Sequence, residues 1–384
     1  MSDARQIEAD IYERLSKVID PELGRSVTDL GMIAAIEAAP ASSDAGTYDV
    51  TVHVELTVPG CPLSETITSQ INGAVSSYPG AQLLPHIEVG SMSRDKLADL
   101  VADLKAERKQ NPFSKPGVKT RIFAIASGKG GVGKSSVTAN LAATFAALGF
   151  DTAAIDADIY GFSLPRLFGV HTQPTNLNGM LMPVTAWGVK LISIGMFAGA
   201  DRAILWRGPR LQRSLEQFLS DVWWGEPDVL LLDLAPGTGD MAISVAQALP
   251  NAELVVVTTP QPSASDIAVR SGLVALQVPM KVRGVVENMS YYEHKGEKLE
   301  IFGAGGGQRV SEQLTQALGY DVPLMAQLPL EPEVRETGPA GRRCWTPTAL
   351  CVRMALARPS EGWLNGCWQC EPAQPHTFVG GAGV

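Results

Sequence analysis

Short apolar runs recur through the central part of the chain, and helix-compatible stretches separate them. Runs of this length without polar alternation are typical of strands that are buried in a parallel sheet. Strands that alternate with helices predict an α/β fold, in which a mostly parallel sheet is flanked by helices and carries a site at the carboxyl ends of its strands. The runs lie at 121–126, 152–155, 228–233, 253–258 and 282–287, and the clearest helical stretch is 135–148.

The first 92 residues have a different pattern, and we expect residues 1–92 to form a separate small α/β domain. Apolar residues at helical spacing predict a helix over 7–18, which the Asp20-Pro21 pair would end. The alternating stretch 48–58 predicts a strand, and 64–75 is compatible with a second helix.

Two segments flank the sheet-forming region, which we expect to span 120–338. Residues 93–119 start with a charged, helix-prone stretch and continue through a proline-containing break, so we expect a solvated helical linker; docking of a partner is the alternative. Within the sheet-forming region, 303–307 is expected to be a flexible loop. Residues 339–384 are rich in Cys, Trp, Arg and Pro and lack periodicity, which predicts an atypical, poorly ordered tail.

One glycine-rich motif at the start of the central region carries the clearest chemistry. Residues 128–135 read GKGGVGKS and match G-x-x-x-x-G-K-[ST] between a predicted strand and a predicted helix. In that context backbone N–H groups surround a polyphosphate, Lys134 reaches the β- and γ-phosphates, and the Ser135 hydroxyl ligates Mg²⁺. A chance glycine-rich turn is the alternative, and it does not explain why every fixed position is present. The predicted ATP contacts are Gly128, Lys129, Gly130, Gly131, Val132, Gly133, Lys134, Ser135 and Ser136.

Aspartates follow two of the predicted strands. Asp233 ends one apolar run, where a Walker-B carboxylate holds Mg²⁺, and Asp156 could support the same metal shell. We expect Asp158 to orient or deprotonate the attacking water. Alone, an aspartate after a strand is more often a helix cap or a turn residue. Together with the phosphate loop, these residues predict an ATP hydrolase with ATP and Mg²⁺ as cofactors.

Composition and charge bear on the compartment and on the classes of partner that we expect for this protein. The chain has 384 residues, 45% of them hydrophobic and 18% charged, and a net charge of −9, which argues against a broad nucleic-acid-binding surface. Residues 1–10 are too polar for a signal peptide, and no run of about 18 apolar residues is present. We therefore expect a cytoplasmic protein without a stable nucleic-acid or membrane partner. The odd number of cysteines, five, does not read as a disulfide framework.

Seven blocks follow one another between about 120 and 338: GKGGVGKSS, DADIYGFSLP, LWRGP, LLLDLAPGTGD, VVVTTPQ, GVVENMS and IFGAGGG. Through these blocks the chain resembles the Mrp/ApbC family of iron–sulfur cluster carrier ATPases, which belong to the deviant-Walker-A class of P-loop proteins. The resemblance implies a homodimer with ATP at its interface, in which Lys129 reaches the partner's γ-phosphate and Asn288 binds the adenine. For Lys129, a solvated loop lysine is the alternative.

The chain departs from the family pattern at two places. Ala235-Pro236 stands where the family usually has Pro-Pro. After Ser290, where many members carry a C-x-x-C that holds a bridging cluster, residues 291–298 contain no cysteine. Cluster binding at the usual place is therefore not predicted.

Three cysteines are candidate cluster ligands. The region 1–92 contains Asp20-Pro21-Glu22-Leu23, Asp29-Leu30-Gly31 and Pro59-Gly60-Cys61-Pro62, and through these pieces it resembles the small iron–sulfur-assembly domain that some carrier ATPases bear. Its Cys61 precedes a predicted helix N-terminus that would lower a thiol pKa. A small buried cysteine is the alternative for Cys61. Cys367 and Cys370 form a C-x-x-C, which in a dimer would supply four thiolates for an iron–sulfur cluster or zinc.

The leading hypothesis is an ATP-hydrolysing carrier that binds iron–sulfur clusters and transfers them to apoproteins, with assembly factors as further partners. A positioning or partitioning ATPase that acts on membrane or DNA is one alternative, although neither an amphipathic membrane helix nor a basic surface is evident. A nucleotide-binding scaffold without useful turnover is the other.

Overall fold

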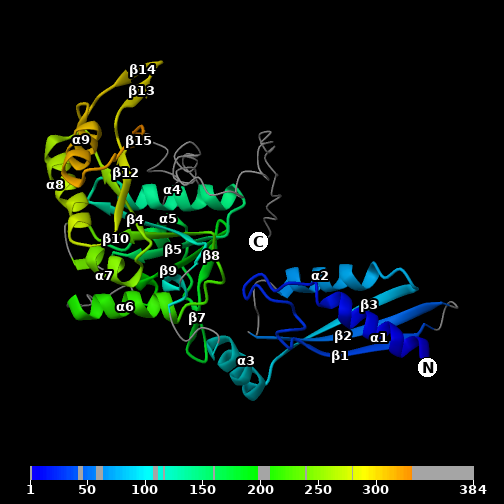
Figure 1. Ribbon diagram of the computed structural model, residues 1–384. Helices are drawn as coiled ribbons and strands as arrows, with labels where there is room; N and C mark the ends of the chain where they lie inside the picture. The colour runs from blue at the N-terminus through cyan, green and yellow to red at the C-terminus, as the bar shows by residue number, and fades with distance from the viewer. Residues whose placement is uncertain are drawn as a thin grey trace.

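The computed structural model describes residues 2–41, 46–57, 64–106, 111–115, 117–158, 161–197, 208–237, 240–278 and 280–330 (Figure 1). None of the helices in these ranges is long and apolar enough to cross a membrane.

A three-stranded sheet with helices on one face forms the N-terminal unit. β1 (Ile33–Pro40) runs antiparallel to the central β2 (Thr47–Leu56), and β3 (Gln82–Ser91) runs parallel to it. α1 (Ser2–Leu15) and α2 (Ser64–Ser76) pack their apolar residues on the alternate, inward-facing valines of β2. The predicted strand and both predicted helices are present, whereas sequence reasoning missed β1 and β3.

The central unit is an eight-stranded sheet, in which β8 runs antiparallel to its neighbour β9 and all other neighbouring strands are parallel. This confirms the predicted α/β fold. The strand order is β15-β12-β11-β4-β10-β5-β9-β8. The bounds are β4 Arg121–Ser127, β5 Thr152–Ala157, β8 Val184–Ala186, β9 Val189–Ser193, β10 Val229–Leu234, β11 Glu253–Thr258, β12 Lys281–Glu287 and β15 Leu324–Gln327.

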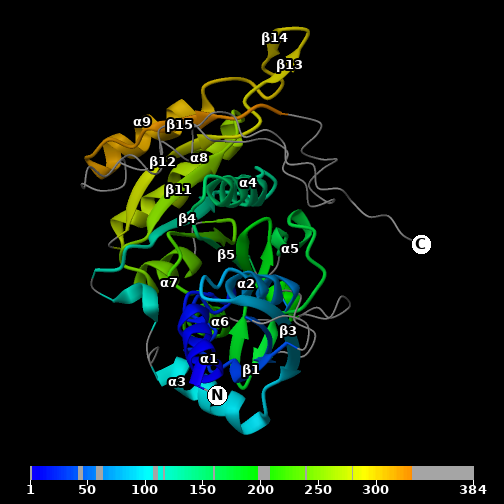
Figure 2. The same cartoon turned by 90° about the vertical axis from the view of Figure 1, so that its right-hand side faces the viewer.

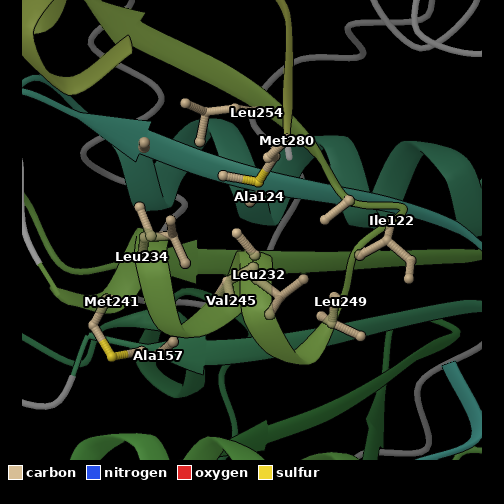
Figure 3. Packing of buried hydrophobic residues seen from close by; sticks show 14 of the residues in the cluster. Ile122, Ala124, Ala157, Leu232, Leu234, Met241, Val245, Leu249, Leu254 and Met280 are labelled. Carbon is tan, nitrogen blue, oxygen red and sulfur yellow. The ribbon is translucent and has the colours of Figure 1, made fainter. Parts of the chain in front are cut away.

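Helices cover both faces of this sheet because successive side chains of each buried strand point to opposite faces. Ile122 and Ala124 of β4 belong to one hydrophobic cluster, and Phe123 belongs to the other. Figure 3 shows the first cluster, where α7 (Asp240–Ala248) places Val245 against Leu232 of β10. α6 (Gly208–Ser220) and α9 (Gly306–Leu318) pack on that cluster, α4 (Lys134–Ala147) packs on the second, and α8 (Pro262–Gly272) contributes to both.

In the described parts of the segment between the two units, apolar side chains are buried in both hydrophobic cores, which contradicts the expectation of a solvated linker there. α3 (Arg94–Ala106) buries Val101 and Leu104 in the N-terminal cluster. The 3-10 helix η1 (Pro112–Ser114) buries Phe113 in the core of the large sheet, and the Asn111 side-chain amide donates a hydrogen bond to the Ala248 carbonyl. The helical spacing of apolar residues in α3 explains the burial, which the high charge of this stretch concealed.

A second connection joins the units. The hairpin of β6 (Thr175–Leu177) and β7 (Met180–Met182) contributes Leu177, Met180 and Met182 to the N-terminal hydrophobic cluster, together with the buried Trp223. The N-terminal unit is therefore packed against the larger unit through apolar side chains.

Candidate nucleotide site

The glycine-rich loop connects the carboxyl end of β4 to the N-terminus of α4, at one edge of the parallel sheet. Gly131 and Gly133 adopt φ values of 81° and 82°, a left-handed conformation that side chains other than glycine rarely adopt. A Cβ at Gly130 or Gly131 would point into open space, whereas a Cβ at Gly128 would lie 2.4 Å from the backbone carbon of Ile267. The loop is thus open on one side and tightly packed on α8 at its start.

Three side chains in the first turns of α4 converge on Asp233, at the carboxyl end of β10. Lys134 Nζ lies 2.7 Å from Asp233 Oδ1, and the Ser135 hydroxyl donates to Oδ2 at 2.5 Å. Thr138, which sequence reasoning missed, donates to Oδ1 at 2.9 Å. Its position, one helical turn after Lys134, was the signal that could have identified it. Ser136 lies in the same first turn.

Asp156 lies directly beside Asp233 in the register of β5 and β10. Its carboxylate accepts hydrogen bonds from the backbone N–H groups of Asp158, Ser163 and Leu164 and from the Ser193 hydroxyl. Burial, followed by the neighbouring negative charge of Asp233, raises the pKa of Asp156 to about 7. The Asp156 carboxyl group therefore changes its protonation state near neutral pH. Its hydrogen bonds to Ser163 and Leu164 hold the start of α5 (Leu164–Leu167) in place.

Asp158 follows β5, is buried, and accepts a hydrogen bond from the Gly161 N–H at 2.9 Å. This contact is the one expected of a turn residue. The role of Asp158 toward an attacking water stays a prediction.

Lys129 is held within its own chain. Its Nζ donates to the Ser263 hydroxyl at 3.1 Å and lies 3.5 Å from Gln261 Oε1, both at the N-terminus of α8. A helix N-terminus repels a cation, so the position depends on these two polar contacts. Contact of Lys129 with a partner subunit stays a prediction.

Asn288 follows β12 and packs against the phosphate loop. Its side-chain amide donates to the Val132 carbonyl at 2.9 Å, and its Nδ2 lies 2.2 Å from where a Cβ on Gly133 would stand. The structure thus brings Asn288 to the loop, and its predicted contact with adenine stays a prediction.

The residues fit ATP and Mg²⁺. The open face of the glycines leaves room for phosphates, and a hydroxyl with an adjacent carboxylate, Ser135 and Asp233, is a donor set that Mg²⁺ accepts alongside phosphate oxygens. Among the described residues, no group of three or more His, Cys, Asp or Glu could hold a metal ion. Cys61, Cys367 and Cys370 lie outside the described residues, as do residues 339–384.

This geometry defines the central unit as a P-loop NTPase. The family model described as NUBPL iron-transfer P-loop NTPase matches residues 118–351, and the model described as iron-sulfur cluster assembly protein matches residues 8–82. The chain belongs to the family of iron-sulfur cluster carrier P-loop NTPases.

Individual relatives match most of the length of this chain. The iron-sulfur cluster carrier protein of Mycobacterium tuberculosis is 47% identical over 340 residues, which are 87% of each chain. That of Bacillus subtilis is 35% identical over 84% of this chain and 88% of its own. Among solved structures, a nucleotide-binding protein from Archaeoglobus fulgidus in complex with ADP superposes with a TM-score of 0.51 at 32% identity, covering 62% of this chain and 91% of that one.

Proposed function

We propose that this protein is an ATPase that carries iron–sulfur clusters and transfers them to apoproteins. The observation that carries the ATPase half is the convergence of Lys134, Ser135 and Thr138 on the buried carboxylate of Asp233. The carrier half is supported by relatives that are named iron-sulfur cluster carrier proteins and that match the chain over most of its length.

The side chains have distinct roles in this proposal. Phosphate oxygens attract Lys134 away from Asp233, and the lysine then neutralises charge on the β- and γ-phosphates. Ser135 and Asp233 would hold Mg²⁺, which would supply positive charge at the phosphates. Asp158 orients the water that attacks the γ-phosphate. Asp156 keeps the start of α5 in place through the hydrogen bonds that it accepts.

We further propose that two copies act together. Lys129 leaves Ser263 and contacts the nucleotide of the partner subunit, where its charge stabilises the transition state in the manner of a trans arginine finger. ATP thereby favours the closed dimer, and hydrolysis releases it.

The cluster is the cargo of this protein, and cysteine thiolates, of which the chain has five, are its usual ligands. Cys61 and the Cys367–Cys370 pair are the candidates, because residues 291–298 hold no cysteine. The family match favours this carrier role over a positioning or partitioning ATPase.

Anaerobic reconstitution tests the carrier half. Iron and sulfide are counted per dimer for the wild-type chain, Cys61→Ser and the double variant Cys367→Ser/Cys370→Ser. We expect a stoichiometric cluster in the wild type and its loss in at least one variant. A wild-type protein that takes up no iron and sulfide would refute the carrier role.

A further inference from the structure

The carboxyl end of β12 holds a buried carboxylate outside the phosphate site. Glu287 is 1% exposed; its Oε2 accepts a hydrogen bond from the Gly307 N–H at 2.5 Å, and its Oε1 accepts one from Gln327 Nε2 at 2.8 Å. In the described part of the chain, Glu287 forms no ion pair with lysine or arginine. A buried carboxyl group requires hydrogen-bond donors, and here Gly307 N–H and Gln327 Nε2 supply them.

The same residue fixes both ends of a projecting segment. The Glu287 carbonyl accepts from the Ser290 hydroxyl at 2.9 Å, while its carboxylate binds Gly307. Between these points lies the hairpin arm, residues 291–305, with strands β13 (Tyr292–His294) and β14 (Glu297–Leu299). Figures 1 and 2 both place this hairpin at one extremity of the molecule, far from the N-terminal unit. Glu287 therefore closes the base of the arm.

Two glycines allow this closure. A Cβ at Gly307 would lie 2.7 Å from the Glu287 Cβ, and one at Gly306 would lie 2.6 Å from the Pro260 carbonyl oxygen. Both glycines are buried in the first turn of α9. The expectation of a flexible loop over 303–307 is thus wrong at its end, because close packing, and not flexibility, requires glycine there.

The next residue along the chain contacts the phosphate loop. Asn288 donates to the Val132 carbonyl through its side chain, and its backbone N–H donates to the Thr258 carbonyl at 2.8 Å. Consecutive residues at the end of β12 therefore bind two different structures: Glu287 binds the base of the arm, and Asn288 binds the loop.

We propose that Glu287 is a positioning residue that couples nucleotide binding at the phosphate loop to the conformation of the hairpin arm. A nucleotide that fixes the loop backbone at Val132 also fixes Asn288, and Glu287 transmits this restraint to Gly307 and Ser290. The coupling is reciprocal, so that a weaker clamp lowers nucleotide affinity. The inference rests on nucleotide binding at the loop and is independent of cluster delivery.

Hydrogen–deuterium exchange of the full-length protein, with and without Mg·ADP, tests the coupling, and calorimetry measures the ADP affinity separately. We expect ADP to slow exchange of amides in 291–305 in the wild type. Glu287→Ala should lose this difference and raise the Kd for ADP at least about fivefold, the lower end of common coupling energies. Glu287→Gln should retain most of the difference, because its amide oxygen still accepts from Gly307. A purely structural role would instead speed exchange throughout α9 and leave the ADP-dependent difference intact.

Two further variants keep the test decisive if Glu287→Ala does not fold. Gln327 is exposed and donates one of the two hydrogen bonds to the Glu287 carboxylate. Gln327→Ala removes this hydrogen bond and should lose part of the ADP-dependent difference in exchange. Gln308→Ala, an exposed glutamine of α9 that contacts Glu312, is the matched control and should behave as wild type. The inference alone is overturned if bound ADP does not change amide exchange in 291–305 of the wild type, or if a folded Glu287→Ala protein shows the same ADP-dependent difference as the wild type. A wild type that binds no ADP overturns the nucleotide site as well.

Discussion

Lys134 and Asp233 form a buried ion pair, with Nζ 2.7 Å from Oδ1 and with side chains that are 5% and 0% exposed. The charge of each compensates that of the other where water cannot reach. Bound phosphates would offer Lys134 a stronger anionic partner and leave Asp233 to Mg²⁺. The pair thus links the stability of the fold to the function of the site.

Lys134→Ala should abolish ATP hydrolysis, with kcat reduced at least about 100-fold because a donor to the transferring phosphate is lost. Urea unfolding should also show a loss of about 3–5 kcal/mol, since Asp233 is left buried without its cation. Lys190→Ala is the matched control, because Lys190 forms its ion pair with Asp151 at the amino ends of β9 and β5, away from the phosphate loop. Normal turnover in Lys134→Ala would refute the site assignment.

Asp156→Asn should change how stability depends on pH. The folded-state pKa of Asp156 is about 7, above its ordinary value of 3.8, so the native state binds this proton more tightly than the unfolded chain does. Its contribution to stability is present below pH about 4 and is lost as pH rises to about 7, by up to about 4 kcal/mol. The asparagine variant should lack this loss.

Urea titrations of the wild type and Asp156→Asn at pH 5 and pH 8 check this. The gap between the two free energies of unfolding should shift in favour of the variant at the higher pH. A gap that does not depend on pH would show that Asp156 is ionised throughout.

Lys129→Ala should reduce hydrolysis and leave the Kd for ADP unchanged, because the proposed contact is with the γ-phosphate of the partner's nucleotide, which ADP lacks. A 1:1 mixture of Lys129→Ala and Lys134→Ala should recover about a quarter of wild-type turnover, since half of the dimers are mixed and each has one complete site. A mixture that is as inactive as its parents would contradict action across the dimer. Ser263→Ala, which frees Lys129 in its own chain, is the companion variant.

Phe113→Ala should cost about 3–5 kcal/mol of stability, as removal of a buried phenylalanine does. Its side chain is 2% exposed in the core of the large sheet, although it belongs to the segment between the units. Phe197→Ala, at a side chain that is 47% exposed, should cost far less. Equal effects in thermal unfolding would show that η1 does not anchor the connecting segment.

The sequence predicted the parallel sheet and the phosphate loop because both depend on local patterns: apolar runs, fixed glycines and an aspartate at a strand end. The contact of Thr138 with Asp233 was missed, since it joins α4 to a distant strand and only the place of Thr138 one helical turn after Lys134 pointed to it. The packing of Phe113 and the clamp at Glu287 were missed for the same reason. The role of glycines 306 and 307 was predicted wrongly, because glycine is found both where the backbone packs closely and where a loop is flexible, and the sequence does not distinguish the two cases.

Cluster transfer tests the central claim most directly. Reconstituted wild-type protein and reconstituted Lys134→Ala are each mixed anaerobically with an apo-ferredoxin, with and without Mg·ATP, and the appearance of holo-ferredoxin is followed by circular dichroism. The account predicts transfer from the wild type that responds to ATP, and a Lys134→Ala protein whose transfer does not. Failure of the loaded wild type to transfer its cluster, or an identical ATP response in both proteins, would contradict it.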